Sequence, residues 1–196
     1  NQGFHSMEFV TFYNDYKNLL GEDTEATGSG TYAQFNGGEV LIQGLELSYG
    51  NLFNYSGFLF PISFSYTFTD AKFNNSFDSE FEPWGNVSIN DELPYIPKNM
   101  FHARIGIKKG KMKSYLRLKH VDKTRIIAGQ DELSLSNSTS KLNIIDLVTR
   151  YQFNRNISLD IKINNLTDSK AIVSTRPAGY RPNMPRQFVT SLIFDF

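Results

Sequence analysis

The segment Ile157-Ser158-Leu159-Asp160-Ile161-Lys162-Ile163-Asn164 decides the fold class of this chain. Apolar and polar residues alternate along it, which places the two sets on opposite faces of a β-strand. The same period of two recurs in seven further segments, and none shows the 3.6-residue period of an amphipathic helix. We therefore predict an all-β chain with strands near 7–17, 38–49, 58–69, 101–108, 111–119, 142–153, 157–164 and 186–196.

The length of these strands indicates their surroundings. Strands of ordinary globular proteins most often have about 5–6 residues, whereas a tilted strand that crosses a membrane needs about 9–11. Most of the segments above run for about 10 to 13 residues, beyond the globular mode and sufficient for a membrane. Strand length therefore favours a membrane protein.

The connections between the strands alternate in length. Outer-membrane barrels show this alternation because their antiparallel strands return through tight periplasmic turns and longer external loops. We therefore predict a transmembrane antiparallel up-and-down β-barrel in which the last strand ends at the periplasmic side. The long connections are 18–36, 72–97, 123–139 and 167–184, and the short ones are 50–56, Lys109-Gly110 and Asn154-Arg155.

The two faces of such strands have opposite chemistry. We expect one charged set to face the lumen: Arg104, Arg117, Lys119, Arg150, Asp160 and Lys162. Aromatic residues are favoured at both membrane interfaces, where an apolar ring with a polar edge suits the headgroups. We expect a periplasmic band of Tyr49, Phe60, Tyr151, Phe153, Phe194 and Phe196, and an outer band of Tyr13, Phe68, Tyr95 and Phe101.

Composition excludes several functions. The 20 basic and 20 acidic residues cancel, which argues against a nucleic-acid partner. There are no cysteines, which excludes disulfides and thiolate sites. The three histidines are scattered, and no Gly-x-Ser-x-Gly elbow occurs. We predict no catalytic residues, no metal site and no cofactor, and hence no enzyme.

Four stretches carry a resemblance to a known family. They are Phe35-Asn36-Gly37-Gly38-Glu39-Val40 with Gly44-Leu45-Glu46-Leu47; Asp91-Glu92-Leu93-Pro94-Tyr95-Ile96-Pro97; Lys162-Ile163-Asn164-Asn165-Leu166-Thr167-Asp168; and Arg176-Pro177-Ala178-Gly179-Tyr180-Arg181-Pro182-Asn183-Met184-Pro185-Arg186. In this order they resemble the C-terminal part of TonB-dependent receptors, nearest to the ferric-citrate and siderophore type.

The resemblance implies a role in transport. Residues 1–196 would supply about eight C-terminal strands of a barrel of about 22, and the N-terminal plug domain with its TonB box would lie outside this chain. The implied function is import of a scarce nutrient, a ferric siderophore or a ferric citrate-like chelate, across the bacterial outer membrane. The expected partners are that ligand, the TonB complex reached through the plug, outer-membrane lipid and lipopolysaccharide.

The motif residues have a predicted structural role. Glycines permit unusual dihedral angles where a loop enters a strand, and prolines keep a chain extended before a strand begins. Phe196 resembles the terminal aromatic by which such barrels are recognised for assembly. The motif residues are Gly37, Gly38, Pro94, Pro97, Asn165, Arg176, Pro177, Gly179, Pro182, Pro185 and Arg186.

The external loops are the predicted ligand site. Arg125 and Gln130 lie in the 123–139 loop, and Arg176 and Arg181 lie in the 167–184 loop. Guanidinium groups donate to carboxylates in a bidentate manner and would suit an anionic chelate. The alternative for these residues is to brace the loops or to face solvent.

Two other architectures fit the same pattern. A complete eight-stranded outer-membrane barrel with a structural or adhesive role would have an interior packed with paired charges. A soluble ligand-binding barrel would be apolar inside and polar outside.

Overall fold

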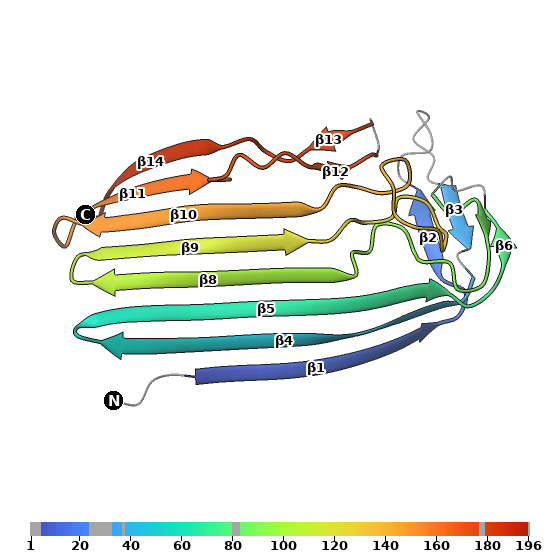
Figure 1. Cartoon of the computed structure of the whole chain (residues 1–196), viewed down its shortest axis with the longest axis horizontal. Helices are drawn as coiled ribbons and strands as arrows, with labels where there is room; N and C mark the ends of the chain where they lie inside the picture. Colours follow the sequence, from blue (N-terminus) through green and yellow to red (C-terminus); the bar gives the residue numbers. More distant parts are fainter. Residues whose placement is uncertain (1–4, 24–32, 37, 80–82, 177–178, 196) are drawn as a thin grey trace.

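Eight long strands form one antiparallel sheet in the computed structural model, which describes residues 5–23, 33–36, 38–79, 83–176 and 179–195 (Figure 1). Each strand pairs with its neighbours in chain order, so the sheet is a meander. This confirms the predicted fold class. The strands are β1 (His5–Tyr16), β4 (Val40–Tyr55), β5 (Phe58–Phe73), β8 (Asn99–Lys109), β9 (Met112–Val121), β10 (Leu142–Gln152), β11 (Ile157–Asn164) and β14 (Gln187–Phe194).

Short hairpins occupy three of the long connections. They pair β2 (Leu20–Asp23) with β3 (Ala33–Asn36), β6 (Phe77–Asp78) with β7 (Asn86–Val87), and β12 (Ile172–Ser174) with β13 (Arg181–Pro182). None of the described residues forms a helix long and apolar enough to span a membrane.

The predicted short connection at 50–56 is wrong in its extent. The β4–β5 hairpin continues to the pair Tyr55 and Phe58, and its turn is Ser56-Gly57 alone. Both turn residues have positive φ, 50° and 77°, as a type I′ turn requires. The tight turn keeps residues 50–55 in the ladder, where their alternation is too weak to be recognised in the sequence. The strand β5 likewise extends to Phe73, past the predicted end.

Long and short connections lie at opposite ends of the sheet, as predicted. Figure 1 shows the tight turns β4–β5, β8–β9 and β10–β11 together at one end and the three small hairpins at the other. The strand β1 starts at the tight-turn end and β14 finishes there. We call the long loops 74–98, 122–141 and 165–186, with the strand ends that they cover, the loop cap.

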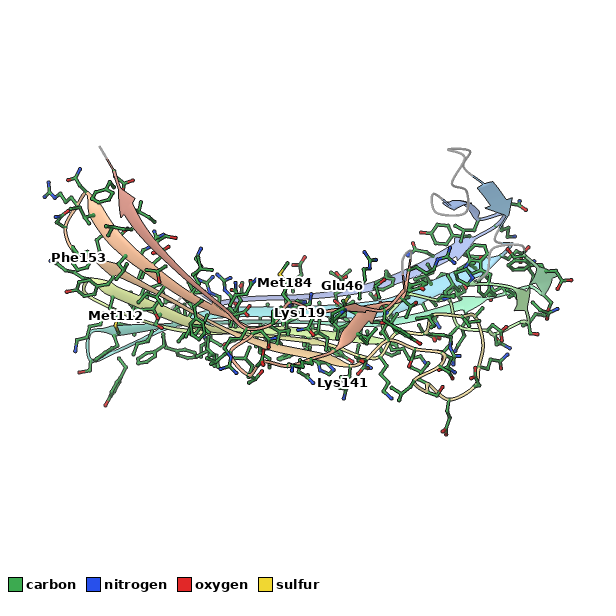
Figure 2. All side chains as sticks on the ribbon, turned by 90° about the horizontal axis from the view of Figure 1, so that it is seen from above. Glu46, Met112, Lys119, Lys141, Phe153 and Met184 are labelled. Carbon is green, nitrogen blue, oxygen red and sulfur yellow. The ribbon has the colours of Figure 1, made fainter. Side chains whose placement is uncertain are left out.

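The sheet is curved and open. Its order begins with β1 and ends with β14, and these two strands do not pair with each other. Figure 2 shows the curvature, with Glu46 on the concave side and Lys141 beyond the opposite side. The eight described strands therefore do not form a closed barrel of their own. Because unpaired strand edges do not occur in lipid, this geometry fits a section of a larger barrel.

The buried core lies in the loop cap and not along the sheet. Phe73 is completely buried, and Trp84 packs against it edge to face with ring centroids 5.4 Å apart. Along the sheet, by contrast, Phe188 is 72% exposed. The core cluster consists of Val40, Ala71, Phe73, Trp84, Val87 and Leu93.

Candidate functional site

The concave face of the sheet is polar. Glu46 on β4 stands opposite Thr67 on β5, and farther along the sheet Arg104 on β8 stands opposite Arg117 on β9. Because side chains alternate across a strand, the register places one set of residues from β1 to β14 on this face, which we call the inner wall. The set is mainly polar but includes Val10, Ile144 and Val189. All six charged residues predicted to face the lumen lie on it: Arg104, Arg117, Lys119, Arg150, Asp160 and Lys162.

The opposite face is apolar. It presents Leu47, Phe64, Leu116 and Leu192 on four different strands. Of the predicted periplasmic aromatics, Tyr151 and Phe153 meet beside the β10–β11 turn, where their ring centroids are 5.1 Å apart. Tyr49 lies instead in the middle of β4, against Phe64. A barrel that is apolar outside and polar inside is the membrane arrangement. The geometry disfavours the soluble alternative, which needs the reverse.

Arg150 and Asp160 form a forked ion pair on the inner wall. Arg150 Nε donates to Asp160 Oδ1 at 2.5 Å, and Nη2 donates to Oδ2 at 2.6 Å. The two residues are directly opposite on β10 and β11. Two parallel charge-assisted bonds fix both side chains, so this pair ties the two strands together.

A cavity of about 410 Å³ opens between the three long loops of the loop cap. Such concave sites with apolar walls and a few polar groups are where small ligands bind. Arg176 is the only one of the four predicted ligand residues among its described lining. The lining residues are Pro83, Tyr95, Ile126, Ile127, Thr175, Arg176, Gly179 and Tyr180.

Tyr95 holds this cavity in shape. Its φ is 62°, a left-handed conformation that is unusual for a bulky residue. Its backbone N–H donates to Arg125 O at 2.7 Å, and its hydroxyl shares a 3.0 Å hydrogen bond with Thr175 Oγ1. Tyr95 therefore lies at the cavity, whereas the sequence predicts it in the outer aromatic band. Tyr180 has no predicted role, because a tyrosine in a polar loop carries no periodic signal.

Arg125 braces the loop cap. Its side chain is 3% exposed, and Nη1 donates to Asp131 Oδ1 at 2.7 Å. Nε lies 3.5 Å from Glu92 Oε2 without a hydrogen bond. The hydrogen bond from Arg125 holds the pKa of Asp131 below its usual value. The burial and pairing of this guanidinium match the bracing alternative.

Gln130 and Arg181 also bond within the loops. Gln130 Nε2 donates to Ile89 O and to Asp91 Oδ1, both at 3.0 Å, which joins two loops. Arg181 Nη2 donates to Ser174 Oγ at 3.0 Å and to Arg176 O. These contacts give both side chains local partners, again as in the bracing alternative.

Asn165 anchors the loop that precedes the last strand. It is 3% exposed with a φ of 52°. Its side-chain amide donates to Ser169 O at 2.9 Å and to Met184 O at 3.0 Å, while its Oδ1 accepts from Ser169 N at 2.8 Å. Three hydrogen bonds therefore close both ends of this loop around one side chain.

Other motif residues occupy turns and loop entries. Gly38 has a φ of 65°, and a Cβ there would lie 2.4 Å from Asn75 Oδ1, an oxygen that accepts a hydrogen bond from Glu39 N. Pro94 is buried ahead of β8, with Pro97 closer to that strand.

The remaining motif residues lie in the loop before β14. Gly179 has a φ of 95°, and Pro182 pairs with Ile172. Pro185 is exposed, and Arg186 N donates to Asp168 Oδ1. Gly37, Pro177 and Phe196 lie outside the described residues.

Fold and faces together define a section of an outer-membrane-type β-barrel wall with a packed loop cap at one end. The sequence model of the family described as "TonB dependent receptor-like, beta-barrel" matches residues 1–166. The chain therefore belongs to the TonB-dependent receptor family, whose members are outer-membrane transporters and not enzymes.

Solved structures agree with this fold. The chain resembles the siderophore receptor PiuA from Acinetobacter baumannii, with a TM-score of 0.71 and 18% identity over 97% of this chain and 26% of PiuA. It resembles the ferric-catecholate import receptor Fiu from Escherichia coli K12, with a TM-score of 0.68 and 20% identity over 96% of this chain and 25% of Fiu. For the copper transporter OprC the TM-score is 0.67, with 16% identity over 98% of this chain and 29% of OprC.

The chain spans about a quarter of the length of these receptors. No curated protein matches its sequence. At these identities the likeness concerns the fold.

Proposed function

We propose that residues 1–196 are the C-terminal portion of the barrel of an outer-membrane receptor that imports a ferric chelate of the siderophore or citrate type. In this proposal the barrel has about 22 strands and encloses an N-terminal plug that receives the pull of TonB. Family membership supports the transport role, and two of the similar structures are named as receptors for siderophores or ferric catecholates.

The observation that carries the ligand class is the cavity in the loop cap. It is lined by Tyr95, Tyr180 and Arg176, and it lies between loops at the end of the sheet opposite the tight turns. Aromatic faces suit flat ligand groups, and a guanidinium pairs with carboxylates or other anionic oxygens. An anionic ferric chelate has both features. Arg125, Gln130 and Arg181 would then support the loops around this site.

Lipid partners follow from the same placement. The apolar outer face would meet the hydrocarbon of the membrane, and the loop cap would rise among the headgroups of the outer leaflet, which include lipopolysaccharide. The exposed Lys141, beyond the convex side in Figure 2, would lie near this level.

Binding measurements on the full-length purified receptor test the ligand class. Ferric citrate, a ferric catecholate and free copper ion are titrated separately, and we expect binding of one ferric chelate. Arg176→Ala should weaken that binding by roughly tenfold or more, as expected for loss of a charge-assisted contact. Arg155→Ala, in the tight turn at the other end of the sheet, is the matched control. Binding of copper alone, or equal affinity in Arg176→Ala, would refute the proposal.

A further inference from the structure

The tight turn between β8 and β9 is strongly basic. Its sequence is Lys108-Lys109-Gly110-Lys111-Met112-Lys113, and residues 99–121 around it contain no aspartate or glutamate. The other two tight turns, within 53–58 and 151–157, also contain no acidic residue. None of the four lysines forms an ion pair with any residue that the structure describes. The β8–β9 turn therefore carries positive charge that its surroundings do not balance.

The strand register divides the four lysines between two sides of the sheet. Lys108 and Lys113 are opposite each other on the inner wall. Lys109 is paired instead with Met112 on the apolar outer face, and Lys111 lies in the turn between the two strands. Of the four, Lys109 and Lys111 are therefore placed to meet the membrane, and we call them the turn lysines.

Aromatic residues flank the turn lysines on both sides. Lys109 Nζ is 3.7 Å from the centroid of the Phe58 ring, which is the geometry of a cation–π contact. Lys111 Nζ donates to Phe153 O at 2.6 Å, and the Phe153 ring packs against Tyr151. Phe58 begins β5 and Phe153 follows β10, the two strands that pair with the β8–β9 hairpin. Both ammonium groups are thus held next to outer-face aromatics.

Neither contact neutralises a lysine. An aromatic ring and a backbone carbonyl bear no formal charge, and each ammonium has three N–H donors. A Cβ at Gly110, between the two lysines, would meet no described atom within 4 Å, so the tip of the turn has open space around it. Because both side chains already have local contacts, an anion bound there would immobilise less rotamer freedom than one bound by free lysines.

The surroundings of the turn lysines indicate a lipid as the anion. Tyr151 and Phe153 are exposed, and they continue the apolar outer face to the level of the turn. Exposed aromatics mark the level of the lipid headgroups, and basic residues at that level attract anionic lipids. A soluble anion would gain nothing from the flanking rings, whereas a phospholipid can contact them with its acyl chains while its phosphate reaches the lysines.

We infer that the turn lysines bind the headgroup of an anionic phospholipid in the membrane leaflet at the tight-turn end. The phosphate oxygens accept hydrogen bonds from Lys109 and Lys111, and the acyl chains run along the outer face beside Phe58 and Phe153. This inference rests on the proposed function only through the placement of the outer face in lipid, and it does not depend on the ligand of the loop cap.

Photo-cross-linking in lipid vesicles tests the site. The full-length receptor is reconstituted into phosphatidylethanolamine vesicles that contain a small fraction of phosphatidylglycerol with a photoreactive group near its headgroup. After digestion, mass spectrometry locates the labelled residues. We expect residues 53–58, 108–113 and 151–155 to be labelled more strongly by this lipid than by phosphatidylethanolamine with the same group. Equal labelling by the two lipids would overturn the inference.

A double variant tests the role of the two charges. Lys109→Gln with Lys111→Gln should reduce the preference for phosphatidylglycerol at these residues by roughly fivefold for each lysine, the scale expected for a basic residue at a membrane surface. Lys109→Arg with Lys111→Arg keeps both charges and should keep most of the preference. An unchanged preference in the glutamine variant, or an equal loss in the arginine variant, would contradict electrostatic recognition of the headgroup.

The same turn offers a matched control on its other side. Lys108→Gln with Lys113→Gln removes the same charge from the inner wall and should leave the labelling preference nearly unchanged. An equal loss in this control would show that the total charge of the turn matters and not the lysines on the lipid side. That outcome would refute the inference.

Two other anions are distinguished by further measurements. Binding to purified peptidoglycan that disappears in the Lys109→Gln, Lys111→Gln variant, together with unchanged lipid labelling, would assign the turn lysines to the cell wall. Inorganic phosphate that abolishes the labelling, where chloride of the same ionic strength does not, would assign them to free phosphate. Either result would overturn the lipid assignment.

The two proposals fail separately. A receptor that binds no ferric chelate but prefers phosphatidylglycerol at the β8–β9 turn would refute the ligand class and leave the lipid site intact. A receptor that binds the chelate but is labelled equally by both lipids would refute the lipid site alone.

Discussion

The sheet and the loop cap use apolar residues in opposite ways. On the sheet, large side chains such as Phe188 and Leu192 stand in single rows on one face and remain exposed in the protein alone. In the loop cap, Phe73, Val40 and Val87 are fully buried. The difference indicates two environments. The outer face of the sheet suits contact with lipid, whereas the loop cap excludes water by its own packing.

Truncation of a core aromatic should show the largest contrast between the two regions. Phe73→Ala removes the ring that packs against Trp84 and Phe77 and should destabilise the loop cap by about 3–5 kcal/mol. Phe188→Ala on the outer face leaves no internal cavity and should leave the cap unchanged. Hydrogen exchange of the loop amides in the full-length receptor measures both effects, and equal protection in the two variants would contradict the comparison.

A charge on the outer face should reveal its lipid contact. Ile105, near the middle of β8, is 54% exposed, and Ile105→Arg should cost about 2–4 kcal/mol in a bilayer if this side chain faces hydrocarbon near the midplane. The control Thr67→Arg introduces the same charge on the inner wall, opposite Glu46, and should cost less. Refolding into lipid vesicles measures the two costs. A larger cost at Thr67 would reverse the assignment of the faces.

Loss of the Asn165 side chain should loosen one loop of the cap. Asn165→Ala leaves Ser169 N without its acceptor and Ser169 O and Met184 O with Asn183 Nδ2 as their remaining donor, and should cost about 1–3 kcal/mol. Asn165→Gly tolerates the φ of 52° but also loses the three hydrogen bonds, so it should recover only part of the stability. Protease susceptibility of residues 165–186 measures the effect. The susceptibility should increase from the wild type to Asn165→Gly and further to Asn165→Ala.

The smallest expected effect concerns pH. Because the Arg125 hydrogen bond lowers the pKa of Asp131 below its ordinary value of 3.8, folding keeps this group charged. The resulting stability is present above pH 3.8 and disappears as the pH falls through the lowered pKa of the folded state. Asp131→Asn should remove this acid-dependent step. Loop protection followed between pH 5 and 2 tests it, and an identical pH profile in the variant would contradict the role of the pair.

Much of the wall was predictable because it depends on local pattern. Ile157 to Asn164 was predicted as a strand over the same residues that the structure assigns to β11, since alternation over eight residues is a strong signal. The tight turns and the inner-wall charges also followed from period and spacing. The end of β4 was not predictable, because Gly50 to Tyr55 mixes polar and aromatic residues without clear alternation. The register with β5 determines where β4 ends.

The loop cap was much less predictable. Arg125 and Arg176 have the same side chain and similar loop positions, yet one is buried against Asp131 and the other lines the cavity. Which of the two occurs depends on contacts between segments far apart in the chain. Tyr95 and Thr175 are 80 residues apart and share a hydrogen bond. No local sequence pattern predicts this contact.

The sequence by itself determined the all-β class, the alternation of long and short connections, and the separation of charged from apolar residues on two faces. These properties depend on the period of two in an extended chain and on turn chemistry, both of which are local. Only the tertiary structure decided that the eight strands stay open, that the core sits in the loop cap, and that like charges meet across β8 and β9. Those outcomes depend on strand register and on packing between distant loops. The residues that contact each side chain there come from distant parts of the chain, so the local sequence does not specify them.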